Sequence, residues 1–82
     1  MDVQVEFYGG LGRLTGTRRH AVTALAEGAT VDALAARLSD DLPRLRPRLE
    51  AVMFAVGNEI VDRTHELHDG DEVALLPPVS GG

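Results

Sequence analysis

The sequence predicts a single α+β domain in which one main helix packs on a mixed sheet of four or five strands. Three observations predict this fold. Residues 2–8 alternate between apolar and polar side chains, as a half-buried strand does. Residues 31–38 carry apolar side chains at helical spacing. Residues 73–76 form a continuous apolar run, which is typical of a fully buried strand. One helix covering one sheet is the economical way to bury these faces in 82 residues.

The first third of the chain is predicted to form two antiparallel strands. In residues 2–8 the side chains that face the core would be those of Val3, Val5 and Phe7. Residues 11–16 would form a loop or a single helical turn that closes at a glycine. A second strand is expected over about residues 18–25, with Thr23 and Leu25 pointing inward. Its register stays open, because the sequence there does not alternate strictly.

The middle of the chain predicts the main helix. Thr30 is a good N-cap, and the helix is expected to run to about Asp41. Its apolar stripe consists of Val31, Leu34, Ala35 and Leu38. The helix ends before Pro43, because a proline disfavours helical geometry at the residue that precedes it. Leu45 and Leu49 would continue as a looser turn against the core.

The last third predicts three strands and their turns. Residues 51–56 read as a strand, a glycine-asparagine turn follows at 57–58, and residues 59–61 form a short edge strand. Leu67 is expected to anchor the next connection to the core. The final strand, starting at Glu72, has the most apolar run, so it and the first strand are predicted to lie parallel at the centre of the sheet.

The chain then ends in a stiff, thin tail, predicted to span residues 77–82. Pro77 and Pro78 cannot donate backbone hydrogen bonds, so they stop the strand and keep the chain extended. Gly81 and Gly82 have no side chains, and such a tip can enter a narrow tunnel in another protein. The alternative interpretation is an ordinary disordered terminus. The terminal carboxylate has a reference pKa of about 3.3–3.7, so it is ionised at neutral pH and reacts only after activation.

Two stretches of this sequence resemble a known family. Residues 69–82 read Asp-Gly-Asp-Glu-Val-Ala-Leu-Leu-Pro-Pro-Val-Ser-Gly-Gly, and residues 3–8 with 13–16 carry Val-Gln-Val-Glu-Phe-Tyr and Arg-Leu-Thr-Gly. Both resemble the small subunits of molybdopterin synthase, a family of ubiquitin-like sulfur carriers, and the similarity covers essentially the whole chain. The resemblance implies the β-grasp fold of ubiquitin, which agrees with the predicted order of elements.

The resemblance also implies a chemical role for the terminus. An adenylating enzyme of the ubiquitin-activating type would use ATP to activate Gly82, and a sulfurtransferase would supply sulfur to leave a thiocarboxylate. The large synthase subunit would accept the tail through Ser80 and Gly81, in a heterotetramer, and sulfur would pass to the pterin precursor to form the dithiolene. Catalytic side chains are expected on that large subunit, so this chain would donate sulfur without catalysing the reaction alone. No bound cofactor is expected.

Four residues are candidates for contact with the partner subunit. The family pattern suggests Tyr8, Ile60 and Leu76 as apolar surface residues, and alternation in the first strand independently places Tyr8 on the outer face. The alternative is that Ile60 and Leu76 belong to the core. Arg13 follows the first strand in a glycine-rich loop, where a partner contact and an ordinary surface role are equally good interpretations.

Composition excludes other chemistry. The chain has no cysteine, so it has neither a disulfide nor a thiol nucleophile, and its net charge of −5 argues against binding nucleic acid. No apolar run approaches the ~20 residues of a membrane span, and no signal peptide is seen, so a cytoplasmic location is expected. His65 and His68 are interpreted as loop residues and not as metal ligands.

A sulfur carrier for thiazole, cysteine or tRNA thiolation, or a ubiquitin-like protein modifier, remains an alternative function.

Overall fold

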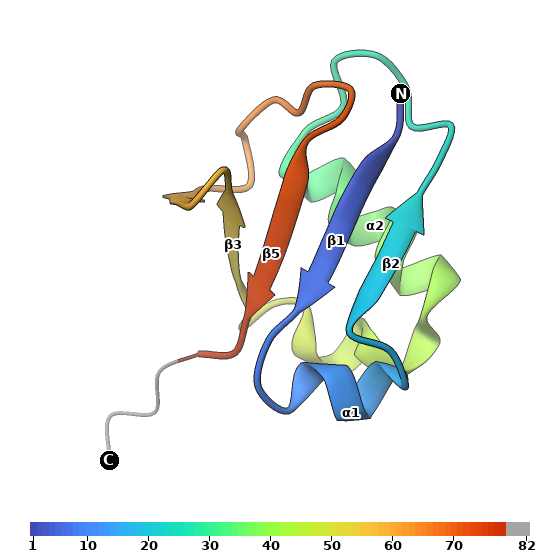
Figure 1. Cartoon of the computed structure of the whole chain (residues 1–82), viewed down its shortest axis with the longest axis vertical. Helices are drawn as coiled ribbons and strands as arrows, with labels where there is room; N and C mark the ends of the chain where they lie inside the picture. The colour runs from blue at the N-terminus through green and yellow to red at the C-terminus, as the bar shows by residue number, and fades with distance from the viewer. Residues whose placement is uncertain (79–82) are drawn as a thin grey trace.

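The computed structural model describes residues 1–78, which form one mixed sheet covered on one face by helices (Figure 1). The five strands lie in the spatial order β2-β1-β5-β3-β4. They are β1 (Val3–Phe7), β2 (Arg19–Val22), β3 (Met53–Val56), β4 (Glu59–Val61) and β5 (Glu72–Leu76). The helices are α1 (Leu11–Thr15), α2 (Val31–Asp41) and the 3₁₀ helix η1 (Pro43–Arg48). The α+β class and the single main helix on a five-stranded mixed sheet are confirmed.

β1 and β5 lie parallel and adjacent at the centre of the sheet, as predicted. β2 and β3 flank them in antiparallel pairing, and β4 forms the outer edge beyond β3. Figure 1 shows that the tail leaves β5 at the same end of the sheet where α1 follows β1. The chain therefore brings a segment from its beginning next to the start of its C-terminal tail.

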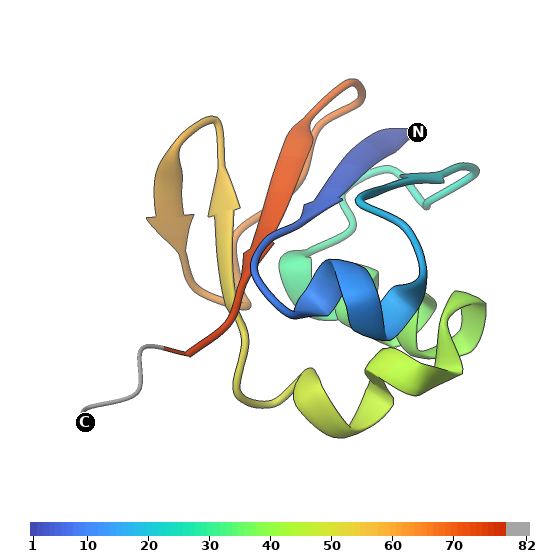
Figure 2. The same ribbon diagram turned by 60° about the horizontal axis from the view of Figure 1, so that its bottom comes forward.

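The core lies between the inner face of the sheet and the helices (Figure 2). α2 presents its predicted stripe to this core, and Thr30 caps the helix by accepting a hydrogen bond from the Ala33 N–H at 3.3 Å. The strands contribute alternating side chains, because successive residues of a strand point to opposite faces. The three central strands contribute to the core cluster the side chains of Val3, Val5, Phe7, Phe54, Val73 and Leu75.

The second strand is shorter than predicted, and the prediction that Thr23 points inward is wrong. Val22 is fully buried, whereas Thr23 is exposed. Val22 pairs with Val3, the first residue of β1, so the ladder between the two strands ends there. Ala24 then turns the chain with a φ of 59°. Leu25 is buried as predicted, but it reaches the core from beyond the strand.

The remaining connections follow the sequence closely. η1 carries Leu45 into the core, and β3 begins at Met53, two residues later than predicted. Gly57 and Asn58 form the β3–β4 turn, both with positive φ. Leu67 is 1% exposed, which confirms it as an anchor. Within residues 1–78, every helix is too short or too polar to span a bilayer.

Candidate functional site

The sheet face opposite the helices is open, and strand pairing fixes which side chains share it. Ala74 of β5 lies opposite Glu6 of β1 on one side and Ala55 of β3 on the other. Ala55 in turn pairs with Ile60 of β4. These residues therefore form one row across the open face, since paired residues in a sheet project to the same side.

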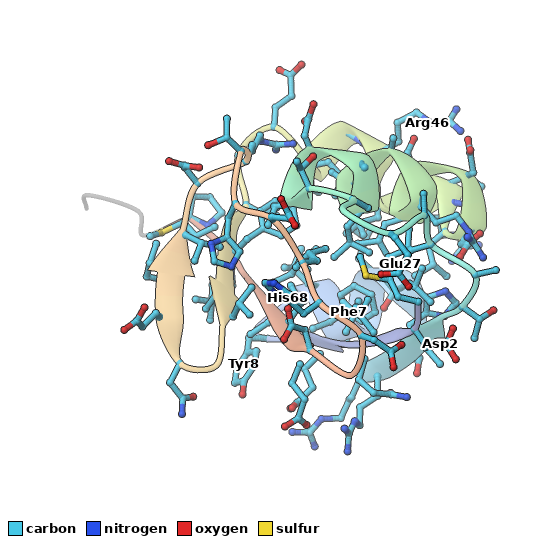
Figure 3. All side chains as sticks on the ribbon, turned by 90° about the horizontal axis from the view of Figure 1, so that it is seen from above. Asp2, Phe7, Tyr8, Glu27, Arg46 and His68 are labelled. Atoms are coloured by element: carbon cyan, nitrogen blue, oxygen red, sulfur yellow. The ribbon has the colours of Figure 1, made fainter. Side chains whose placement is uncertain are left out.

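A second row lies next to the tail. Leu76, the last residue of β5, pairs with Met53 of β3. Tyr8 continues the line of β1, because its N–H donates to the Leu75 carbonyl oxygen at 3.0 Å. Figure 3 shows Phe7 between the sheet and the helices and Tyr8 pointing away from the opposite side. The second row is thus Tyr8, Leu76 and Met53.

Together the two rows expose a group of large apolar side chains. Among residues 1–78, Tyr8 is 46% exposed, Met53 38% and Ile60 56%, and these are the exposed large hydrophobic residues. Leu76 is half-buried beside them. We call Tyr8, Met53, Ile60 and Leu76 the apolar patch. An apolar surface of this kind on a small domain commonly marks a protein interface.

Three of the four predicted contact residues meet in this patch. Ile60 is exposed, which excludes the interpretation that it belongs to the core, and Leu76 faces outward because Val73 and Leu75 take the inner positions. Met53 was missed by sequence reasoning. The signal was present, because the buried Val52 and Phe54 on either side require Met53 to face the other way.

Arg13 lies beside the patch and not within it. It is exposed on α1 and lines a surface hollow of about 360 Å³ whose wall includes Tyr8 and Gly9. Tyr8 also lines a smaller hollow of about 130 Å³, together with Ala55, Ala74, Glu6 and Glu72. Tyr8 therefore borders both hollows.

The exit of the tail is fixed by a close approach to Gly9. Gly9 has a φ of +57°, and a Cβ placed on it would lie 3.0 Å from Cγ of Pro77. The start of the tail is thus seated against the segment that links β1 to α1, next to Tyr8. Gly82, predicted as the reactive residue, and Ser80 and Gly81, predicted to insert the tail into the partner, lie outside the described residues.

Comparison with known proteins identifies the family. The model of the ThiS family matches residues 5–82, nearly the whole chain. This chain belongs to the ThiS family. The Escherichia coli protein named molybdopterin synthase sulfur carrier subunit is 37% identical over 98% of this chain and 99% of its own length.

Two solved structures extend the likeness of this ThiS-family chain. The crystal structure of SAMP1 from Haloferax volcanii, a protein also called small archaeal modifier protein 1, superposes with a TM-score of 0.89 at 26% identity. A complex of subunits 1 and 2 of the molybdopterin-converting factor from Helicobacter pylori matches with a TM-score of 0.71 at 29% identity. Both matches cover all of this chain and all of the other.

One of the ion pairs of this ThiS-family chain lies on the open face. Arg19 and Glu72 form an ion pair at 3.6 Å on the open face, and both side chains are more than half exposed. Such a pair contributes little to stability. Hydrogen bonds from Thr64 hold the pKa of Asp62 below its usual value, at a loop outside the patch. Within residues 1–78, no three His, Cys, Asp or Glu side chains gather as metal ligands.

Proposed function

We propose that this chain is the sulfur carrier subunit of a molybdopterin synthase and works in the cytoplasm. The observation that carries the proposal is the 37% identity to the Escherichia coli sulfur carrier subunit over nearly the full length of both chains. The geometry is consistent with that role, because an exposed apolar patch lies where the tail leaves the sheet. A carrier needs such a combination, in which one surface holds the partner while the terminus reaches its active site.

The reactive group in this proposal is the α-carboxyl of Gly82. An adenylating enzyme of the ubiquitin-activating type joins it to AMP from ATP and releases pyrophosphate. A sulfurtransferase then supplies sulfur that displaces AMP and leaves a thiocarboxylate. The globular domain takes no chemical part in these steps, which is consistent with the absence of cysteine from the sequence.

Sulfur transfer to the pterin precursor takes place in the large synthase subunit. The apolar patch docks on that subunit, and Ser80 and Gly81 thread the tail toward the catalytic side chains that the large subunit provides. Two carriers flank a large-subunit dimer in the heterotetramer. The Helicobacter pylori complex of subunits 1 and 2 of the molybdopterin-converting factor supports a two-subunit assembly of this kind.

Mass spectrometry tests the chemistry at the terminus. When the chain is incubated with its adenylating enzyme, ATP and a sulfur donor, its mass should increase by the difference between sulfur and oxygen. A variant that lacks Gly82 should fold with an unchanged melting temperature and gain no mass. A variant extended by one residue beyond Gly82 should behave in the same way. If sulfur were found on the shortened chain, or on any residue other than Gly82, the α-carboxyl of Gly82 would be ruled out as the group that carries it.

A protein modifier is the second candidate, and the likeness to SAMP1 favours it. In that case Gly82 would form an amide with amines of other proteins. The same incubation with a cell extract then produces a ladder of larger species instead of a thiocarboxylate. A carrier for thiazole, cysteine or tRNA thiolation would gain sulfur but would not bind the large synthase subunit, so a binding assay with that subunit separates it from the first proposal.

A further inference from the structure

Hydrogen bonds to backbone carbonyl groups hold the wall of the larger hollow beside Tyr8. The hollow lies between α1, the end of β1 and the segment that leads into β2, with a volume of about 360 Å³. The Phe7 N–H donates to the Arg18 carbonyl oxygen at 2.9 Å, which ties one wall to β1. The Thr15 hydroxyl donates to the Thr17 carbonyl oxygen at 2.8 Å, which ties the same wall to α1. The hollow therefore does not depend on the position of a flexible side chain alone.

Glycines keep the hollow open. Gly16 ends α1 with a φ of +80°, and its N–H donates to the Gly12 carbonyl oxygen. Gly12 lines the hollow, and a Cβ there would lie 3.7 Å from Cγ of Arg18, an ordinary contact distance. Space that a side chain at position 12 would fill is thus left free beside an arginine.

Two arginines that line this hollow have no acidic partner within residues 1–78. Arg13 and Arg18 are exposed, and neither side chain forms an ion pair or hydrogen bond there. By contrast, Arg19, Arg37 and Arg63 each pair with a carboxylate. Glu6 also lines the hollow, and its carboxylate forms no ion pair within residues 1–78. Two arginines thus outnumber one carboxylate in this depression, on a chain whose net charge is −5.

The hollow is continuous with the apolar patch. Tyr8 belongs to the patch and lines the hollow, and Gly9 lines the hollow and contacts the tail through Pro77. A protein that covers Tyr8 therefore also lies at the edge of the hollow. Two guanidinium groups that become covered need a negative partner, and a carboxylate accepts two parallel hydrogen bonds from each.

We propose that this hollow receives an acidic side chain of the large synthase subunit, bound between Arg13 and Arg18. The inference rests on the proposed function for the identity of the partner. The apolar patch supplies the contact area, whereas the charged contact fixes the rotation of the domain on its partner. Charged contacts at an interface act chiefly on orientation, association rate and discrimination between partners. A correct rotation matters here, because the tail must point into the active site.

Charge reversal tests the proposal in the full-length chain. The double variant Arg13→Glu/Arg18→Glu should bind the large subunit about tenfold or more weakly at low ionic strength, since like charges would then face each other. The difference should shrink at high salt, which screens exposed charges. The matched control is Arg44→Glu/Arg48→Glu on η1, which makes the same change in net charge outside both hollows. Isothermal titration calorimetry at two salt concentrations measures all three proteins.

Further measurements separate the possible failures. Thermal melting shows whether each variant folds, and Arg13→Gln/Arg18→Gln should give a smaller loss of affinity in the same direction. Amide signals of Gly12 and Thr17 should shift when the wild-type chain binds the large subunit. If wild type binds the large subunit and Arg13→Glu/Arg18→Glu binds it no more weakly than Arg44→Glu/Arg48→Glu does, the hollow has no such role, although the proposed function stands. If wild type itself fails to bind the large subunit, the proposed function falls and this inference falls with it.

Discussion

Gly9 decides how the tail leaves the sheet. Its φ of +57° lies in the left-handed region, and Pro77 sits where a side chain at this position would project. Any other residue would combine an unfavourable backbone conformation with a contact against a rigid ring. The direction of the tail at Pro77 is therefore tied to the absence of a side chain at position 9, at the other end of the sequence.

Gly9→Ala should lower the free energy of unfolding by about 1–2 kcal/mol, the cost of a left-handed non-glycine residue. Urea denaturation measures this change. Gly10→Ala is the matched control, because Gly10 has a φ of −65° and nothing within 4 Å of the added Cβ. The control should stay within about 0.5 kcal/mol of wild type. Equal losses of stability in the two variants would show that neither the left-handed backbone nor the contact with Pro77 disfavours a side chain at position 9.

The orientation of Leu76 shows what the sequence could not provide at the scale of single residues. The run Val73-Ala74-Leu75-Leu76 is apolar throughout, so alternation does not reveal which side chains face inward. Pairing with β1 and β3 decides it, because Leu75 lies opposite Phe7 and Phe54. Partners on other strands, and not local pattern, therefore place Leu76 in the apolar patch.

At the scale of elements, a charged contact links an edge strand to the main helix. His20 on β2 lies 3.2 Å from Asp41, the last residue of α2, and Arg37 one turn earlier lies 3.1 Å from the same carboxylate. The hydrogen bond from His20, and then that from Arg37, hold the pKa of Asp41 below its usual value of 3.8 despite some desolvation. The carboxylate thus joins two elements that follow one another in the sequence.

This lowered pKa predicts a pH dependence of stability. A carboxyl with a folded-state pKa below its unfolded value stabilises the protein above the unfolded pKa, and the effect is lost as pH falls through the folded pKa. The melting temperature of wild type should therefore exceed that of Asp41→Asn at pH 6, and the gap should close below the usual value of 3.8.

Differential scanning calorimetry across this range measures the gap. The neighbouring exposed residue supplies the control, because Asp40 forms no ion pair within residues 1–78. Asp40→Asn should keep the wild-type pH dependence. A constant gap between wild type and Asp41→Asn down to pH 3 would show that the contact with His20 does not depend on the charge of Asp41.

The two kinds of element differ in how well the sequence predicts them. The limits of α2 were predicted from the N-cap at Thr30, the apolar stripe and Pro43, which are all local signals. β2 lacks such signals, and Thr23 was wrongly placed inside. The regular pairing ends at Val22 opposite Val3, the chain turns at Ala24, and Leu25 then bonds to Met1. Contacts with another part of the chain therefore set this end of the strand.

At the scale of the whole molecule, the apolar patch should carry the affinity for the large subunit. Ile60 is 56% exposed on the edge strand β4, so Ile60→Asp should leave the free energy of unfolding nearly unchanged. The same change should weaken binding about tenfold or more, as expected for a charge placed in the apolar centre of an interface.

Ala36→Asp provides the comparison for Ile60. Ala36 is exposed on α2, outside the patch, and receives the same new charge. Surface plasmon resonance with the immobilised large subunit should show wild-type affinity for this variant. If Ile60→Asp binds the large subunit with the same affinity as Ala36→Asp, the partner approaches another surface, and the apolar patch needs a different explanation.

The central position of β5 also bears on how the protein is made. β5 is the last strand within residues 1–78, yet β1 and β3 both pair with it. During translation the sheet cannot close until the codons for residues 72–76 have been read and that segment has left the ribosome. A product terminated before residue 72 would lack its middle strand and leave β1 and β3 without the partner that lies between them. Any molecule with a closed sheet therefore also possesses the segment that leads into the tail.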